Sequence, residues 1–214
     1  MPDEIPLPAR MRHLPRDRHG RVVPWFVAWI DGVPDFRVVR EDGIEDALNF
    51  RGCWLCGQRL GKFTSFVIGP MCAVNRVSAE PGCHQECAVY AARACPFLAN
   101  PNMVRRERNK PEHVEPGGTM ILRNPGVALV WTSRNSKPFR VPGGILMDVG
   151  DPVAVGWYAH GRDATRDEVL ASIDSGLPLL REAAAKDPQA RDALAELDAQ
   201  YARALELVAA VKEA

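Results

Sequence analysis

The sequence has no run of about 18 consecutive apolar residues, so it predicts no helix that spans a membrane. Its first four residues, Met1-Pro2-Asp3-Glu4, lack the basic start and the apolar segment of a secretory signal peptide. We therefore expect a cytoplasmic protein with no membrane partner. Thiols stay reduced in that compartment, so the six cysteines predict metal ligands or free thiols rather than disulfides.

Histidine is scarce, and nucleotide-binding fingerprints are absent. Apart from His84, which falls in the metal-ligand pattern described below, none of the five histidines lies beside an obvious nucleophile at a recognisable spacing. The sequence contains neither a phosphate-binding loop nor a dinucleotide fingerprint, and it shows no internal repeat. An HNH-type nuclease would need a histidine base on the strand expected at residues 63–68, which has none. We therefore assign no catalytic residues, and the sequence leans against an enzyme.

Four residues in two pairs have the spacing of a metal site. Cys53 and Cys56 are three positions apart, and Gly57 directly after them gives the backbone freedom for a tight turn. His84 and Cys87 are also three positions apart, and such positions lie on one face of a helix. Three sulfurs and one ring nitrogen favour Zn²⁺ in a closed tetrahedral site, which is structural rather than catalytic. We predict one structural zinc ion on these four residues.

The remaining cysteines leave alternatives open. Cys83 can replace His84 as a ligand, because it lies one helical turn before Cys87. Cys72 can approach the ion, whereas Cys95 is more typical of a small apolar core residue. A redox role for the first cysteine pair would need a helix opening at its first cysteine, and the glycine after the pair breaks such a helix. A second zinc ion would need Cys72, Cys83, Cys95 and His113.

The segment between the two ligand pairs predicts β-structure. Residues 62–68 are strand-like, the breaker Gly69-Pro70 follows, and we expect residues 71–77 to return as the second strand of a hairpin. Knuckle, hairpin and a helix with the second ligand pair occur in this order in treble-clef zinc fingers, and residues 53–98 resemble that family. Most of the chain also resembles a family of bacterial and phage-encoded proteins, a resemblance that implies no activity. It is carried by the cysteine knuckle and by residues 23–29, 66–76, 94–98 and 164–180.

We expect an α+β protein made of successive segments. The Asp31-Gly32 pair predicts the turn of an N-terminal β-hairpin, and residues 44–50 predict a short helix before the knuckle. Strand-like runs between Gly and Pro turns predict a later antiparallel sheet of five short strands. The expected segments are an extended solvated arm (1–20), the hairpin with the zinc module (21–98), a Pro-rich basic linker (99–118), a small antiparallel sheet (119–160) and C-terminal helices (161–214).

The C-terminal segment predicts a helical hairpin. Thr165 and Glu168 fit a capping box, and we expect that helix to end at Ser175-Gly176. A second helix then has Pro178 in its first turn, and a third begins at Asp187-Pro188. We favour a last helix that folds back on its neighbour, with self-association or a protein partner through residues 190–211 as the alternative. Its apolar heptad seam consists of Leu194, Leu197, Tyr201, Ala204, Val208 and Val211.

Charge is balanced overall but unevenly distributed. Residues 51–140 carry 13 basic and 5 acidic residues, a formal charge of +8, whereas residues 1–50 carry −2 and residues 141–214 carry −6. A basic run within this middle region is compatible with a phosphate-contacting patch, although for the run alone we favour a solvated linker. Its cations, the candidate nucleic-acid-binding residues, are Arg105, Arg106, Arg108 and Lys110.

Three functional hypotheses follow. The first is a non-catalytic zinc protein that binds nucleic acid through its basic central region. The second is a protein–protein adaptor, including a phage factor that acts on a host complex, which uses the heptad helix at residues 190–211. The third is an enzyme in which zinc is only a scaffold, with a pocket near Cys72, Asn75 and Arg76.

Overall fold

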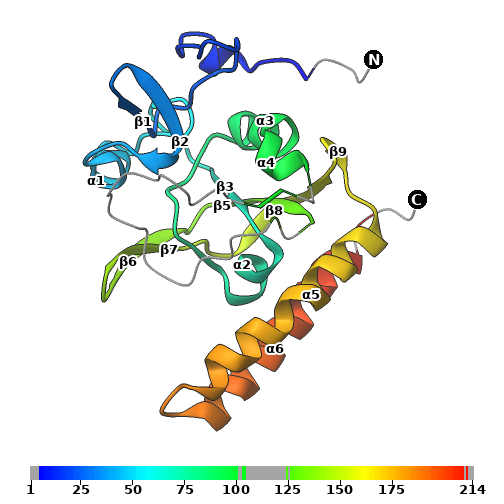
Figure 1. The fold of residues 1–214 in the computed structure, drawn as a ribbon. Coiled ribbons are helices and arrows are strands. Elements are labelled where there is room, and N and C mark those ends of the chain that lie inside the picture. Colours follow the sequence, from blue (N-terminus) through cyan, green and yellow to red (C-terminus); the bar gives the residue numbers. More distant parts are fainter. Residues whose placement is uncertain (1–4, 101–102, 105–123, 125, 210, 212–214) are drawn as a thin grey trace.

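The computed structural model describes residues 5–100, 103–104, 124, 126–209 and 211 (Figure 1). Across these residues the protein is α+β, with three small antiparallel sheets and a C-terminal pair of long helices, as the sequence predicts. None of the helices in these ranges has the length and apolar content needed to cross a lipid bilayer. Most of the expected linker and the first strand of the expected late sheet, at residues 120–123, lie outside the described residues.

The N-terminal hairpin forms where the sequence predicts it. Strands β1 (Val27–Ile30) and β2 (Val33–Val39) pair antiparallel, with Ile30 opposite Val33. The two loop residues both have positive φ, 49° at Asp31 and 76° at Gly32, as a type I′ turn requires. The expected short helix follows as α1 (Gly43–Asn49).

A four-stranded antiparallel sheet organises the rest of the protein. One of its two inner strands, β5 (Ala128–Ser133), is buried along its whole length. The side chains of β5 alternate between two cores, with Leu129 and Trp131 in one and Ala128 and Val130 in the other. A strand covered on both faces explains the continuous apolar run in the sequence. The strands lie in the order β3 (Thr64–Ile68), β5 (Ala128–Ser133), β8 (Pro152–Ala159) and β9 (Arg162–Asp163).

Different helices cover the two sides of this sheet (Figure 1). Helices α3 (Gln85–Ala94) and α4 (Pro96–Ala99) pack on one side, where Ala88 and Ala92 join the core that contains the knuckle. The other core lies against α2 (Pro70–Asn75) and the C-terminal helices. Strand β3, from the expected zinc module, thus pairs directly with β5, from the expected later sheet. The boundaries of the expected segments remain a prediction.

The expected hairpin at residues 62–77 is wrong. The residues after Gly69 form helix α2 (Pro70–Asn75) instead of a strand, because proline at a first helical position is already set to a helical φ. Strand β4 (Val77–Ser78) then pairs with β7 (Gly144–Asp148), which also pairs with β6 (Lys137–Val141) to complete the third sheet. The treble-clef resemblance remains a prediction.

The first C-terminal helix is longer than expected. Its capping box is confirmed, since Thr165 accepts from the Glu168 amide and the Glu168 carboxylate accepts from the Thr165 amide at 2.8 Å. The predicted end at Ser175-Gly176 is wrong, because α5 (Arg166–Ala185) continues through Pro178. Gly176 serves close packing instead: a Cβ there would lie 2.7 Å from the Met71 sulfur of α2.

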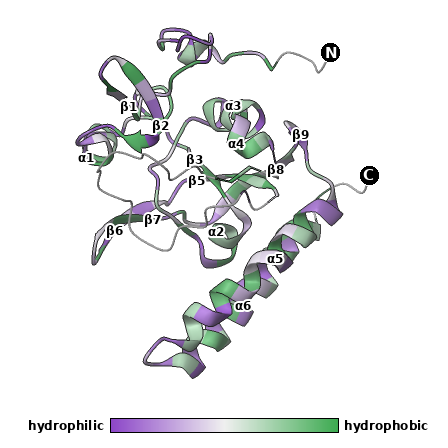
Figure 2. Ribbon diagram, viewed as in Figure 1, coloured by the Kyte–Doolittle hydropathy of each residue, from purple (hydrophilic) through white to green (hydrophobic). Residues whose placement is uncertain are grey.

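The last helix, α6 (Ala190–Ala209), folds back on α5 and also contacts α2. Three members of the heptad seam, Leu197, Ala204 and Val208, are buried in the core of their own chain. The Tyr201 hydroxyl donates to Asp174 of α5 at 3.1 Å. Figure 2 shows hydrophobic and hydrophilic residues alternating along both helices, as expected for helices with one buried side.

The N-terminal residues do not form the solvated arm that their Pro and Arg content predicts. From residue 5 onward the chain lies on the knuckle core, and Met11, in the short 3₁₀ helix Ala9–Met11, is 2% exposed. Leu14 is buried beside it. A bridge between Arg16 and Val22 then returns the chain toward β1. These two apolar side chains, three positions apart, pack the segment against the knuckle core.

Candidate metal centre

The knuckle is a tight turn closed by its own backbone. The Gly57 amide donates to the Cys53 carbonyl at 2.8 Å, and the Cys53 amide donates to the Gln58 carbonyl at 2.8 Å. Gly57 has a φ of 74°, and a Cβ there would lie 2.6 Å from the Trp25 ring. Glycine is therefore required for both backbone conformation and space.

The second ligand pair lies where α3 begins. His84 is the N-cap residue and Cys87 lies in the first turn, so their side chains leave the same end of the helix. A one-residue bridge holds this end to the central sheet, with Ser65 and Cys83 exchanging backbone hydrogen bonds of 2.9 and 2.6 Å. The Trp54 amide donates to the Gly82 carbonyl at 3.0 Å, which ties the knuckle to the same segment.

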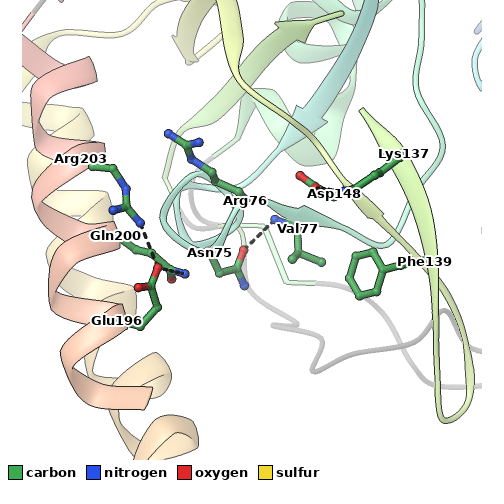
Figure 3. Close-up of a pocket in the computed structure, with 9 residues that line it drawn as sticks. All are labelled: Asn75, Arg76, Val77, Lys137, Phe139, Asp148, Glu196, Gln200 and Arg203. Atoms are coloured by element: carbon green, nitrogen blue, oxygen red, sulfur yellow. Dashed lines mark hydrogen bonds and ion pairs between the residues drawn. The ribbon is translucent and has the colours of Figure 1, made fainter. Parts of the chain in front are cut away.

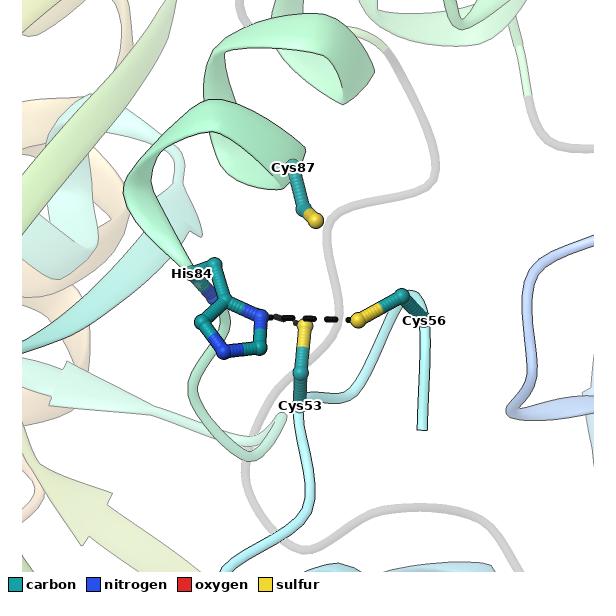
Figure 4. A group of neighbouring side chains, drawn as sticks. All are labelled: Cys53, Cys56, His84 and Cys87. Carbon is teal, nitrogen blue, oxygen red and sulfur yellow. Dashed lines mark hydrogen bonds between the residues drawn. The ribbon is translucent and has the colours of Figure 1, made fainter. Parts of the chain in front are cut away.

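The structure brings the four predicted ligands together. Their donor atoms, three sulfurs and one imidazole nitrogen, all lie within 4.8 Å of one another (Figure 4). All four residues are buried, with His84 the most exposed at 8%. This donor set suits a tetrahedral transition-metal ion, and its enclosure leaves no open position for a substrate. The residues that could hold one metal ion are Cys53, Cys56, His84 and Cys87.

The histidine ring is fixed on both sides. Its Nδ1 lies 3.4 Å from the Cys56 sulfur, and its Nε2 lies 3.1 Å from the carbonyl oxygen of Arg59. A ring that donates Nε2–H to a carbonyl presents the lone pair of Nδ1 to the sulfurs, as metal-binding histidines do. The backbone amide of His84 also donates to the Cys53 sulfur at 3.3 Å.

The Cys53 sulfur accepts hydrogen bonds from neighbouring thiols. Contacts with Cys56, and then with Cys83 and Cys87, lower the pKa of Cys53. The same contact with Cys53 is the main reason that the pKa of Cys56 is raised to about 11 and that the pKa values of Cys83 and Cys87 are also raised. The sulfurs alone therefore favour a single thiolate. A divalent cation between them would stabilise several thiolates together.

The other cysteines lie outside the four-donor group. Cys83 is buried and hydrogen-bonds to Cys53, but its side chain is not one of the four that converge. Cys72 is half-buried against the core on the far side of the sheet, and Cys95 is the half-buried N-cap of α4. Within the described ranges no second metal-binding group forms, and His113 falls outside those ranges.

Two supports of the site escaped the sequence analysis. The Arg59 carbonyl that meets His84 carries no signal in the sequence, because any residue supplies a carbonyl oxygen. The N-terminal segment also reaches the site, where Arg10 pairs with Glu86 at 2.9 Å and contacts Gln58 at 3.3 Å. The apolar pair Met11 and Leu14 in that segment could have indicated that the segment packs on the protein. The predicted nucleic-acid-binding residues Arg105, Arg106, Arg108 and Lys110 lie outside the described residues.

A pocket of about 380 Å³ lies between α2, the β6–β7 hairpin and α6 (Figure 3). It includes Asn75 and Arg76 of the enzyme hypothesis, but Cys72 does not line it. The side chains that line it include no thiol, hydroxyl or imidazole, and its charged side chains are one lysine, two arginines and two carboxylates. Its cations form ion pairs: Arg76 with Asp151 at 2.9 Å, Arg203 with Glu196 at 3.0 Å and Lys137 with Asp148 at 3.9 Å.

Comparison of the chain with protein-family models, with curated proteins and with solved structures finds no match. The fold and the site therefore define the class: an α+β protein with a buried group of three cysteines and one histidine that could hold one metal ion. The resemblance to treble-clef fingers and to bacterial and phage proteins remains a prediction.

Proposed function

We propose that this group binds one structural Zn²⁺ ion and that the protein is non-catalytic. The observation that carries the proposal is the enclosure of three sulfurs and one nitrogen within 4.8 Å in a buried site. Sulfur-rich, four-coordinate sites select Zn²⁺ over Mg²⁺ and Ca²⁺, which prefer oxygen ligands. The site joins the knuckle to α3, so the ion stabilises the contact between two distant parts of the chain.

Substitution of the ion by Co²⁺ tests the donor set directly. A tetrahedral site with three thiolates gives strong visible absorption and a sulfur-to-metal charge-transfer band, whereas a surface site on oxygen ligands gives neither. Replacement of Cys53 by Ser should weaken both bands, and Cys95→Ser should leave them unchanged because Cys95 lies outside the group. Equal spectra for the two variants would contradict the assignment.

We further propose that the protein binds nucleic acid through its basic central region. The support is the formal charge of +8 on residues 51–140, beside net negative charge in the segments before and after it. Clustered Lys and Arg displace counterions from phosphates, which gives affinity without the need for a catalytic group. The six cysteines form no disulfide with one another, which supports a cytoplasmic location.

Binding to labelled oligonucleotides across a salt series tests this proposal. Affinity should fall steeply with salt, and the triple substitution Arg105→Gln, Arg106→Gln and Arg108→Gln should reduce both affinity and the salt slope, by about one unit for each phosphate that the variant no longer neutralises. A matched triple on the C-terminal helices should retain binding. That control neutralises three exposed arginines, Arg181, Arg191 and Arg203. Absence of binding by the unaltered protein would overturn the proposal.

The adaptor hypothesis has less support. Its proposed surface was the heptad seam, and Leu197, Ala204 and Val208 are already buried by the same chain. A partner at residues 190–211 would have to use the outer, largely charged side of α6, and such partners remain a prediction.

A further inference from the structure

A strip of exposed aromatic and basic side chains lies beside the candidate metal centre. We call it the knuckle strip, and its two rings are 71% exposed at Phe50 and 42% exposed at Phe63. The four cations of the strip are exposed as well. The knuckle strip consists of Phe50, Arg51, Arg59, Lys62, Phe63 and Arg134.

Backbone contacts make the first half of the strip continuous. The Arg51 carbonyl accepts from the Leu60 amide at 2.7 Å, and its guanidinium donates to the Gly61 carbonyl at 3.1 Å. A bridge between Gly52 and Arg59 pairs the same two stretches antiparallel. The chain that carries Phe50 and Arg51 therefore runs beside the chain that leads from Arg59 to Phe63.

The central sheet adds the last cation. Thr64 pairs with Ser133 at the end of the β3–β5 ladder, which places the next residues on each strand, Phe63 and Arg134, side by side. The Arg134 guanidinium lies 4.5 Å from the centroid of the Phe63 ring. An aromatic ring with a cation on it can stack on a base while the cation reaches a phosphate.

Negative charge is absent from the segments that build the strip. The sequence contains no Asp or Glu between Asp46 and Glu80, and none between Glu115 and Asp148. The Asp46 carboxylate, at one border, is engaged by Arg40 at 2.7 Å. Among the described residues, none of the four cations of the strip forms an ion pair with a carboxylate. Their charge is therefore available to an anionic partner.

We propose that the knuckle strip binds single-stranded nucleic acid, with Phe50 and Phe63 stacked on bases and the four cations on phosphates. This inference rests on the proposed nucleic-acid-binding function and assigns it a site and a strand preference. Exposed rings favour single strands, because bases within a duplex are already stacked on each other. The strip is also connected to the metal centre, because the Arg59 carbonyl accepts a hydrogen bond from Nε2 of His84.

Fluorescence anisotropy with labelled oligothymidylate and oligouridylate of about 12 nucleotides, and with a duplex of the same length, tests the inference on the full chain. Single strands should bind more tightly than the duplex, and the two single-strand probes show whether a 2′-hydroxyl matters. Phe50→Ala and Phe63→Ala should each weaken single-strand binding by at least about fivefold, and Phe63→Trp should retain it. Duplex binding should change little.

Phe36→Ala is the matched control. Phe36 is 40% exposed on β2 and has the Arg21 guanidinium 5.1 Å from its ring centroid, so it reproduces the Phe63–Arg134 pair elsewhere on the surface. Its substitution should leave binding unchanged. Full affinity of Phe50→Ala and Phe63→Ala, equal binding of duplex and single strand, or an equal loss with Phe36→Ala would overturn the inference. Such a failure would not by itself overturn the proposed function. The proposed function would still stand if the triple variant at Arg105, Arg106 and Arg108 showed reduced binding.

Discussion

The two ring nitrogens of His84 contact the knuckle and the segment directly after it: Nδ1 lies 3.4 Å from the Cys56 sulfur, and Nε2 lies 3.1 Å from the Arg59 carbonyl. His84, the N-cap residue of α3, thus links the turn to the start of that helix. The carbonyl contact selects the tautomer in which Nδ1 is available to a metal. This relationship distinguishes His84 from the adjacent Cys83, which the sequence alone leaves as an alternative candidate.

Of the substitutions at these adjacent positions, only His84→Ala should lower the metal content. His84→Ala removes a donor, so we expect less than one metal ion per chain and a lower melting temperature. Cys83→Ala should retain one ion, because its sulfur lies outside the group of four. Elemental analysis of both variants decides between them, and loss of metal from Cys83→Ala alone would reverse the assignment.

Gly57→Ala should destabilise the protein more than Gly20→Ala. Both glycines have similar positive φ, 74° and 76°, so both substitutions carry a backbone cost of about 1–2 kcal/mol. Only at Gly57 does the added Cβ also meet a ring, that of Trp25 at 2.6 Å. Urea unfolding should show the larger loss of stability at Gly57. Equal midpoints for the two variants would contradict the close approach.

Leu197→Ala should destabilise the monomer and leave the oligomeric state unchanged. Leu197 is 6% exposed in the core beneath α6, so its truncation should cost about 2–5 kcal/mol. Leu179→Ala, at a position 47% exposed on α5, should cost no more than about 0.5 kcal/mol. Thermal unfolding at several protein concentrations provides the measurement. A melting temperature that rises with concentration, and does so less in Leu197→Ala, would favour self-association through the seam.

Glu168 should make stability depend on acid pH. Its hydrogen bonds with Arg162 are the main reason that its pKa is lowered from 4.5 to about 2. The folded protein therefore gains stability from ionised Glu168 above pH 4.5, and loses it as the pH falls toward 2. Glutamine preserves the capping box without the charge, so Glu168→Gln should be less stable at pH 7 by up to about 1 kcal/mol.

Urea unfolding at neutral and acid pH measures this effect. The difference in free energy of unfolding between the unaltered protein and Glu168→Gln should narrow as the pH falls. Any effect of acid on the cysteine group is common to both proteins, so the difference isolates Glu168. Glu206→Gln, at an exposed position on α6, is the matched control and should change stability by no more than about 0.5 kcal/mol. A constant difference for Glu168→Gln would show that its charge does not contribute.

The sequence predicts local features well where one residue type determines the backbone. The turn at Asp31-Gly32 and the capping box at Thr165 are of this kind, because their residues satisfy a specific backbone geometry. The metal-binding group was also predictable, because paired ligands at a spacing of three can converge only in a few local structures. In each case the information lies within a few positions.

The predictions from sequence are wrong where contacts between residues far apart in the sequence determine the local structure. Gly176 favours a helix end by propensity, but the Met71 side chain packed beside it makes glycine a packing choice within a continuous helix. Strand β3 finds its partner in β5, about 60 residues later, rather than in the residues that follow it. The Pro and Arg residues of the N-terminal segment predict a polar arm, whereas its two apolar side chains, Met11 and Leu14, pack in the knuckle core.

The most direct test is the metal content and melting temperature of pure, tag-free protein. Elemental analysis should find one zinc ion per chain, and a chelator should lower the melting temperature, because the ion joins the knuckle to α3. Protein without a stoichiometric transition metal, whose melting temperature is unchanged by the chelator, would contradict the account.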